Sequence, residues 1–91
     1  MKDIANDTIV LDKLSIRLKK LQSQALTALQ GLISELDKSS QYLEGEQFNV
    51  AKESVASATA TTDTICKDIE KAYEYIENLK KIVVEYSKLK F

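Results

Sequence analysis

The sequence predicts an all-α fold, an antiparallel two-helix hairpin that pairs with a second hairpin into a four-helix bundle. Apolar residues recur at spacings of three and four residues in both halves of the chain, which places them on one face of a helix. The chain has no proline, and the second of its two glycines, Gly45, lies at its midpoint. Because two helices in a 91-residue chain bury little apolar surface, we expect a second chain to complete the core.

The first helix is expected over about residues 8–42, with Asn6 or Asp7 as its N-cap. Leu26 and Ile33 widen its apolar face beyond what one neighbouring helix covers, which also favours a partner chain. Gly31 lies inside the pattern and is expected to permit close packing, since the apolar spacing continues past it. The face consists of Leu11, Leu14, Leu18, Leu21, Ala25, Leu29, Leu32 and Leu36.

The second helix is expected over about residues 47–88, because a heptad-like spacing of three and four persists through this range. The stretch Ser54–Thr64 is rich in Ala, Ser and Thr, so a disordered linker is the alternative there. The unbroken spacing favours a helix whose small residues let a neighbour approach closely. The seam consists of Phe48, Ala51, Val55, Ala58, Thr62, Ile65, Ile69, Ala72, Ile76, Leu79, Val83 and Tyr86.

A turn is expected over about residues 43–46. Gly45 adopts a left-handed conformation without steric cost, so we expect it to end the first helix near residues 42–44 as the residue after its C-cap. A connection this short makes the two helices antiparallel neighbours. The predicted partner interface is the apolar face of both helices: Leu11, Leu14, Leu18, Leu21, Leu29, Leu32, Leu36, Ala51, Val55, Ala58, Ile65, Ile69, Ile76, Leu79 and Val83.

Composition argues against several functional classes. The net charge is −1 and positive and negative residues are interspersed, so the sequence predicts no basic patch that would bind nucleic acid. The chain has no histidine, and Cys66 is its one cysteine, so we expect no enzyme, no cofactor and no metal site, with Cys66 as a small apolar residue rather than a nucleophile. Apolar runs are too short for a membrane span, and residues 1–7 lack the apolar segment of a signal peptide.

The turn carries a resemblance to a known family. Leu43-Glu44-Gly45, with an aromatic Phe48 three residues after the glycine, resembles the turn of the WXG family, the small ESAT-like proteins of type VII secretion systems. Since Leu43 stands where that family has tryptophan, the chain resembles the divergent Leu-x-Gly branch, which includes small helical partners of LXG toxins. The alternative is a plain helical hairpin in which Gly45 serves the turn alone.

The resemblance implies a non-enzymatic co-secreted partner or targeting factor. It would leave the cytoplasm without a signal peptide, contact the type VII secretion machinery, and pair as a homodimer or heterodimer with another hairpin or with the helical N-terminal region of a toxin. The alternative function is an intracellular or structural helical-bundle subunit with no export role. A needle-type secretion subunit is also a hairpin, but its family turn carries prolines, which this chain lacks.

A second family feature is Tyr-x-x-x-Asp/Glu near the C-terminus, which the export machinery reads. Tyr73 and Glu77 match it, and their spacing places both side chains on one helical face. Tyr42 and Glu46 match the same pattern. Two interpretations of Tyr73 and Glu77 therefore remain open, an export signal or a half-exposed tyrosine beside a solvated glutamate.

Overall fold

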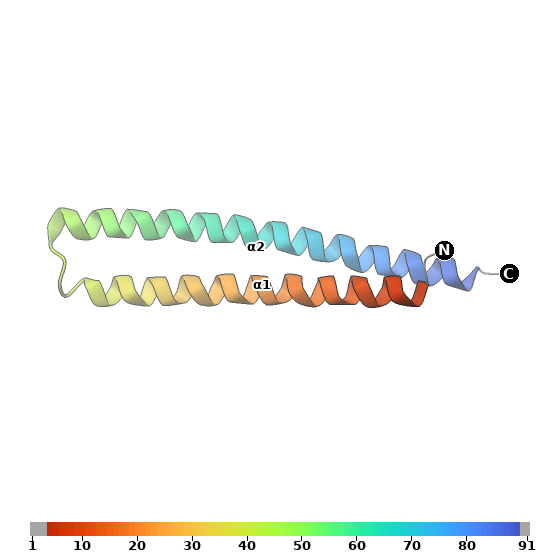
Figure 1. The fold of residues 1–91 in the computed structure, drawn as a ribbon. Helices are drawn as coiled ribbons and strands as arrows, with labels where there is room; N and C mark the ends of the chain where they lie inside the picture. Colours follow the sequence, from red (N-terminus) through yellow and green to blue (C-terminus); the bar gives the residue numbers. More distant parts are fainter. Residues whose placement is uncertain (1–3, 90–91) are drawn as a thin grey trace. The chain divides into compact units, whose positions relative to one another are not determined.

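A computed structural model of the protein describes residues 4–89, which form two α-helices and no strand. Helix α1 spans Ile4–Ser39 and helix α2 spans Gly45–Lys88 (Figure 1). The predicted all-α helical hairpin is confirmed. Its pairing into a four-helix bundle stays a prediction.

Helix α1 begins and ends earlier than the predicted range of 8–42. Asn6 or Asp7 was predicted as the N-cap, which is wrong, because both residues lie inside α1. Asp7 instead places a negative charge in the first turn, where it interacts favourably with the helix dipole.

Two serines explain why α1 ends at Ser39. The Ser39 hydroxyl donates to the Leu36 carbonyl at 2.7 Å, and the Ser40 hydroxyl donates to the Asp37 carbonyl at 2.7 Å. Serine hydroxyls that bond nearby carbonyls compete with the helical ladder and satisfy the carbonyls left open at a helix end. The chain then tightens into a turn, in which the Tyr42 N–H donates to the Ser39 carbonyl at 2.9 Å.

Gly45 has the predicted left-handed backbone, with φ of 53°. Its predicted place was wrong, however, because Gly45 is the first residue of α2 and does not end α1. The connection therefore covers residues 40–44 rather than 43–46, and α2 starts two residues earlier than predicted. Apart from its chain neighbours and the adjacent backbone of its own helix, no atom lies within 4 Å of where a Cβ on Gly45 would be, so the turn needs glycine for its backbone conformation and not for space.

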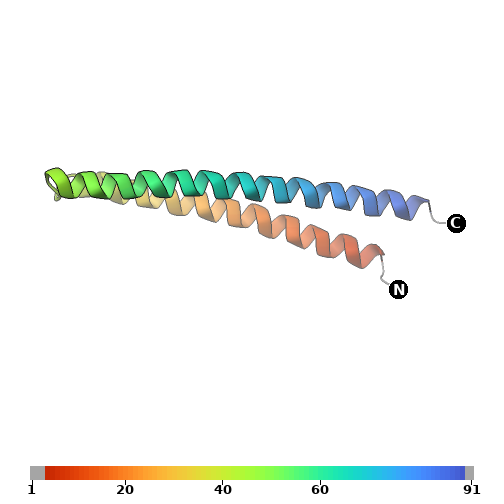
Figure 2. The ribbon, with the colours of Figure 1, turned by 90° about the horizontal axis from the view of Figure 1, so that it is seen from above.

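The chain divides into two units. The first unit comprises Met1–Leu21 and Asp68–Phe91, and the second comprises Gln22–Lys67. Within each unit a segment of α1 lies alongside a segment of α2, and the two segments run in opposite directions (Figures 1 and 2).

The stretch Ser54–Thr64 is helical, so the disordered-linker alternative is wrong. Three threonine hydroxyls there donate to the carbonyl four residues earlier: Thr59 to Val55 at 2.9 Å, Thr62 to Ala58 at 2.8 Å and Thr64 to Ala60 at 3.1 Å. These bonds satisfy the hydroxyls within the helix itself.

Little of the described chain is buried. Leu11, at 9% exposure, is the one buried apolar residue, and Ser15, at 5%, is the one buried polar residue among those described. Helix α2 contains no buried residue. Between residues 4 and 89, neither helix holds a stretch that is both long and apolar enough to cross a lipid bilayer.

Candidate functional site

The predicted partner interface separates into two groups of residues. One group packs between the helices: Leu11 is buried, and Leu18, Leu29, Leu36, Ala51, Val55, Ala58, Ile69, Ile76, Leu79 and Val83 are half-buried. The other group is exposed, namely Leu14, Leu21, Leu32 and Ile65. The first group of apolar residues therefore stabilises the hairpin, and the second group is left uncovered.

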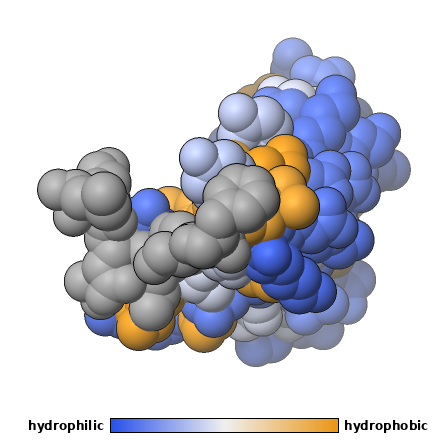
Figure 3. Space-filling model, turned by 90° about the vertical axis from the view of Figure 1, so that its right-hand side faces the viewer, coloured by the Kyte–Doolittle hydropathy of each residue, from blue (hydrophilic) through white to orange (hydrophobic). Residues whose placement is uncertain are grey.

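The first unit exposes further large apolar residues that the predicted interface omitted. Figure 3 views the protein from the end where α1 begins and α2 ends, and apolar surface emerges there between hydrophilic side chains. Most of these exposed residues do not continue the spacing of three and four residues along the seam, so the pattern did not select them; Tyr86 does continue it but was left out of the predicted interface. These exposed residues are Ile9, Val10, Ile16, Tyr75, Ile82, Val84, Tyr86 and Leu89.

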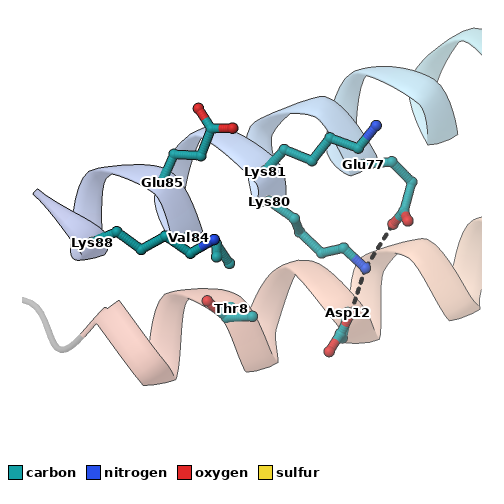
Figure 4. A pocket seen from close by; sticks show the side chains of 8 residues that line it. All are labelled: Thr8, Asp12, Glu77, Lys80, Lys81, Val84, Glu85 and Lys88. Atoms are coloured by element: carbon teal, nitrogen blue, oxygen red, sulfur yellow. Dashed lines mark hydrogen bonds and ion pairs between the residues drawn. The ribbon is translucent and has the colours of Figure 1, made fainter.

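Four polar residues connect the two helices of the first unit, and we call them the polar clamp: Asp12, Ser15, Glu77 and Lys80. The Lys80 Nζ donates to Asp12 Oδ1 at 2.5 Å and lies 2.8 Å from Glu77 Oε2 (Figure 4). The Ser15 hydroxyl donates to the same Glu77 oxygen at 2.8 Å. Glu77 therefore accepts hydrogen bonds from residues of both helices.

The clamp changes the acidity of two of its members. Hydrogen bonds from Lys80 and then from Ser15 hold the pKa of Glu77 below its ordinary value. Hydrogen bonds to the carboxylates of Asp12 and then of Glu77 raise the pKa of Lys80. Both charged forms are favoured, so Glu77 and Lys80 are ionised at neutral pH.

One helical turn further along, Lys19 of α1 contacts α2 twice. Its Nζ lies 3.1 Å from Glu70 Oε2 and 4.3 Å from the centre of the Tyr73 ring. A cation this close to a ring face is attracted by the ring's quadrupole. Both members of the candidate export signal, Tyr73 and Glu77, are thus in contact with α1, and their role in export stays a prediction.

The polar contacts between the helices were not predicted, although the sequence holds a signal for them. On α1, Asp12, Ser15 and Lys19 are spaced by three and four residues. On α2 the same spacing runs through Glu70, Tyr73, Glu77 and Lys80. Two polar stripes of matching period would have indicated facing helix edges.

An open groove of about 360 Å³ lies between α1 and α2 in the first unit (Figure 4). Asp12, Glu77 and Lys80 of the clamp line one part of it, and Thr8 and Val84 lie among the other lining residues. No three His, Cys, Asp or Glu side chains between residues 7 and 89 gather as they would around a metal ion.

The turn motif belongs to the second unit. Leu43 and Phe48 are half-buried, and Tyr42 beside them is 83% exposed. Phe48 lines a second groove, of about 390 Å³, together with Ile33 and Leu36 of α1. Leu43 and Phe48 are thus partly covered by the hairpin and partly exposed at its surface.

Cys66 is half-buried and unpaired, as a small apolar residue in a helix is expected to be. Its backbone carbonyl accepts from the Gln22 side-chain amide at 3.2 Å. This bond joins α1 to α2 inside the second unit and uses the backbone of Cys66, not its thiol.

Comparison of the chain with protein-family models, with curated proteins and with solved structures finds no match. The resemblance to the WXG family therefore depends on the residues of this chain alone, chiefly Leu43, Gly45 and Phe48.

Proposed function

We propose that the protein is a non-enzymatic helical component of a type VII secretion system. It acts as a co-secreted partner or targeting factor for a helical effector or toxin. Its mechanism is the burial of exposed apolar residues against another helical hairpin, which completes a four-helix bundle. The partner is a second copy, a related hairpin, or the helical N-terminal region of a toxin.

The observation that supports partner binding is the uncovered apolar surface. The chain exposes 7393 Å², whereas a folded monomer of 10.2 kDa exposes about 5,300 Å². Sixteen large apolar residues are exposed, and one apolar residue is buried, among those described. Because stable pairwise interfaces bury about 1,200–2,000 Å² in total, the excess is sufficient for one partner.

The support for a secretion role is the turn. Gly45 adopts the left-handed conformation that a turn glycine provides, and Leu43 and Phe48 lie on either side of it. Both side chains are half-buried, so each can contact a second chain at this end of the second unit without unfolding the hairpin. In the proposal, these two residues form the recognition element of the family motif.

The test is export that depends on the secretion ATPase. We would measure the protein in culture supernatant from cells with and without that ATPase, using a cytoplasmic marker to correct for lysis. Loss of the protein from the supernatant in the ATPase mutant, at unchanged total expression, supports the proposal. Retention of the protein in the cells of both strains would refute this proposal and favour the alternative, an intracellular bundle subunit.

A further inference from the structure

The side of α1 that points away from α2 in the first unit has a distinct composition. Leu11 and Ser15 are buried and Leu18 is half-buried, so these residues mark the side of α1 that faces α2. A residue two positions away from any of them lies about 200° around the helix, on the opposite side. The residues at those positions, which we call the outer face, are Ile9, Lys13, Ile16, Arg17 and Lys20.

The outer face is basic and holds no acidic residue. Its three cations are exposed, and no ion pair among the described residues involves them: Lys13, Arg17 and Lys20. Asp7 precedes Leu11 by four residues, which places Asp7 on the side of α1 that faces α2. Asp12 is bonded across to Lys80 of α2. The three positive charges of the outer face are therefore left for an anionic partner.

Two isoleucines add aliphatic surface to the same face. Ile9 is 51% exposed and Ile16 is 67% exposed, and neither belongs to the predicted partner interface. Seven residues separate them, which is about two helical turns, so the two side chains form one row along α1. Lys13 and Lys20 have the same separation and form a second row beside the first. An aliphatic row beside a basic row is typical of helices that lie in the surface of an anionic membrane.

The outer side of α2 in the same unit lacks this pattern. Ile76 and Val83 are half-buried, and the residues two positions away from them include Glu74, Lys81 and Glu85. Charges of both signs on that side give little net attraction to an anionic surface. The basic face therefore belongs to α1.

We propose that the first unit binds to the surface of a membrane that contains anionic phospholipids, with the outer face of α1 in the headgroup layer. Lys13, Arg17 and Lys20 contact lipid phosphates through their flexible side chains. Ile9 and Ile16 reach the boundary between the headgroups and the acyl chains. This inference goes beyond the proposed secretion role and does not depend on it.

The shape of the outer face favours a lipid surface over an acidic protein. The face is the convex side of a single helix, and neither of the two grooves described above includes any of its residues. A protein partner gains most of its affinity from a few side chains that fill pockets, whereas a bilayer surface needs no pocket.

The first experiment measures co-sedimentation of the purified protein with vesicles of phosphatidylcholine, with or without phosphatidylglycerol. One basic residue near an anionic surface raises the affinity about 5-fold, so three are expected to favour the anionic vesicles about 100-fold. Salt at about 1 M, where the Debye length is about 3 Å, is expected to abolish this preference. Equal binding to both kinds of vesicle, or binding to neither, would overturn the proposal.

The second experiment locates the binding face by charge reversal. Lys13→Glu is expected to weaken binding to the anionic vesicles about 30-fold, because it removes one attraction and adds one repulsion. Its control, Lys71→Glu, makes the same charge change at an exposed position two residues from the half-buried Ile69, on the side of α2 that points away from α1. Lys71 and the outer face are two helix diameters apart, about 20 Å, which exceeds the Debye length of about 8 Å at physiological salt. We therefore expect the control to change the affinity less than about 2-fold, and equal losses would overturn the outer face as the binding site.

The third experiment distinguishes a lipid surface from an acidic protein. Ile16→Asn keeps every charge and is expected to weaken binding to the anionic vesicles at least about 5-fold, because an aliphatic side chain no longer enters the bilayer. Ile82→Asn, at a position of α2 with 62% exposure, is expected to bind as the wild type does. Immobilised polyglutamate serves as the acidic polymer without an apolar interior. Tighter binding to polyglutamate than to vesicles, with no effect of Ile16→Asn on vesicle binding, would overturn the lipid surface as the partner.

Vesicle binding and export are separate measurements, so the two proposals can fail independently. Binding through the outer face, together with retention of the protein in the cell, would support this proposal and refute the secretion role. Export that depends on the secretion ATPase, without binding to anionic vesicles, would support the secretion role and overturn this proposal.

Discussion

Replacement of Leu11 by alanine tests whether the contact between α1 and α2 in the first unit depends on one buried side chain. The change removes three carbon atoms, each contributing about 0.8 kcal/mol when fully buried. At 9% exposure nearly all of that contribution is lost, so we expect the free energy of unfolding to fall by about 2 kcal/mol. Half-exposed neighbours can relax into the space, which keeps the loss near the lower end for Leu→Ala.

The matched control is Ile16→Ala, which also removes three carbon atoms from α1. Since Ile16 is 67% exposed, we expect a loss under about 1 kcal/mol. Urea unfolding followed by circular dichroism, at equal protein concentrations and with equal m-values, measures both changes. Equal losses for the two variants would refute the reasoning, because they would mean that burial within the single chain does not distinguish these positions.

Three other predictions concern the clamp and the turn. Because folding lowers the pKa of Glu77, its contribution to stability is present above pH 4.5 and is lost as the pH falls below it. Glu77→Gln should therefore reduce stability at pH 7 and flatten the acid limb of an unfolding titration, while Glu74→Gln, at an exposed position, should not. Gly45→Val should lower the free energy of unfolding by about 1–2 kcal/mol, because Gly45 has a positive φ. Gly31→Ala, inside α1 with open space around it, should raise the free energy of unfolding by up to about 1 kcal/mol, as measured by thermal unfolding. Leu43→Met should change stability by under about 1.5 kcal/mol. If Leu43 is a recognition residue, this variant should lower export at unchanged melting temperature; export that follows stability alone would reduce the motif to a turn.

The periodic spacing of apolar residues was enough to predict both helices and their antiparallel connection. It was not enough for the helix ends, because hydroxyls of Ser39 and Ser40 bond carbonyls of the last turn and stop α1 three residues early. The left-handed conformation of Gly45 was predicted from residue type, but its place depended on that earlier stop.

The site was predicted less completely than the fold. The apolar spacing grouped Leu11 with Leu14 as one interface, and only the packing of α1 against α2 shows that the first is covered and the second is not. The clamp was missed because the pattern of one helix does not fix its register against another. Ser15 and Glu77 are 62 residues apart in the sequence, and their contact exists only once that register is set.

The absence of buried residues in α2 has a consequence for the lifetime of the protein in the cell. A chain that buries so little by itself opens often, and proteases cleave the opened form. We expect unpaired copies to be degraded quickly and paired copies to persist, so that proteolysis adjusts the amount of this protein to that of its partner. After translation is blocked, Leu14→Glu should disappear faster than the wild type, and Ile16→Glu should not. Equal half-lives for all three chains would show that pairing does not protect the protein.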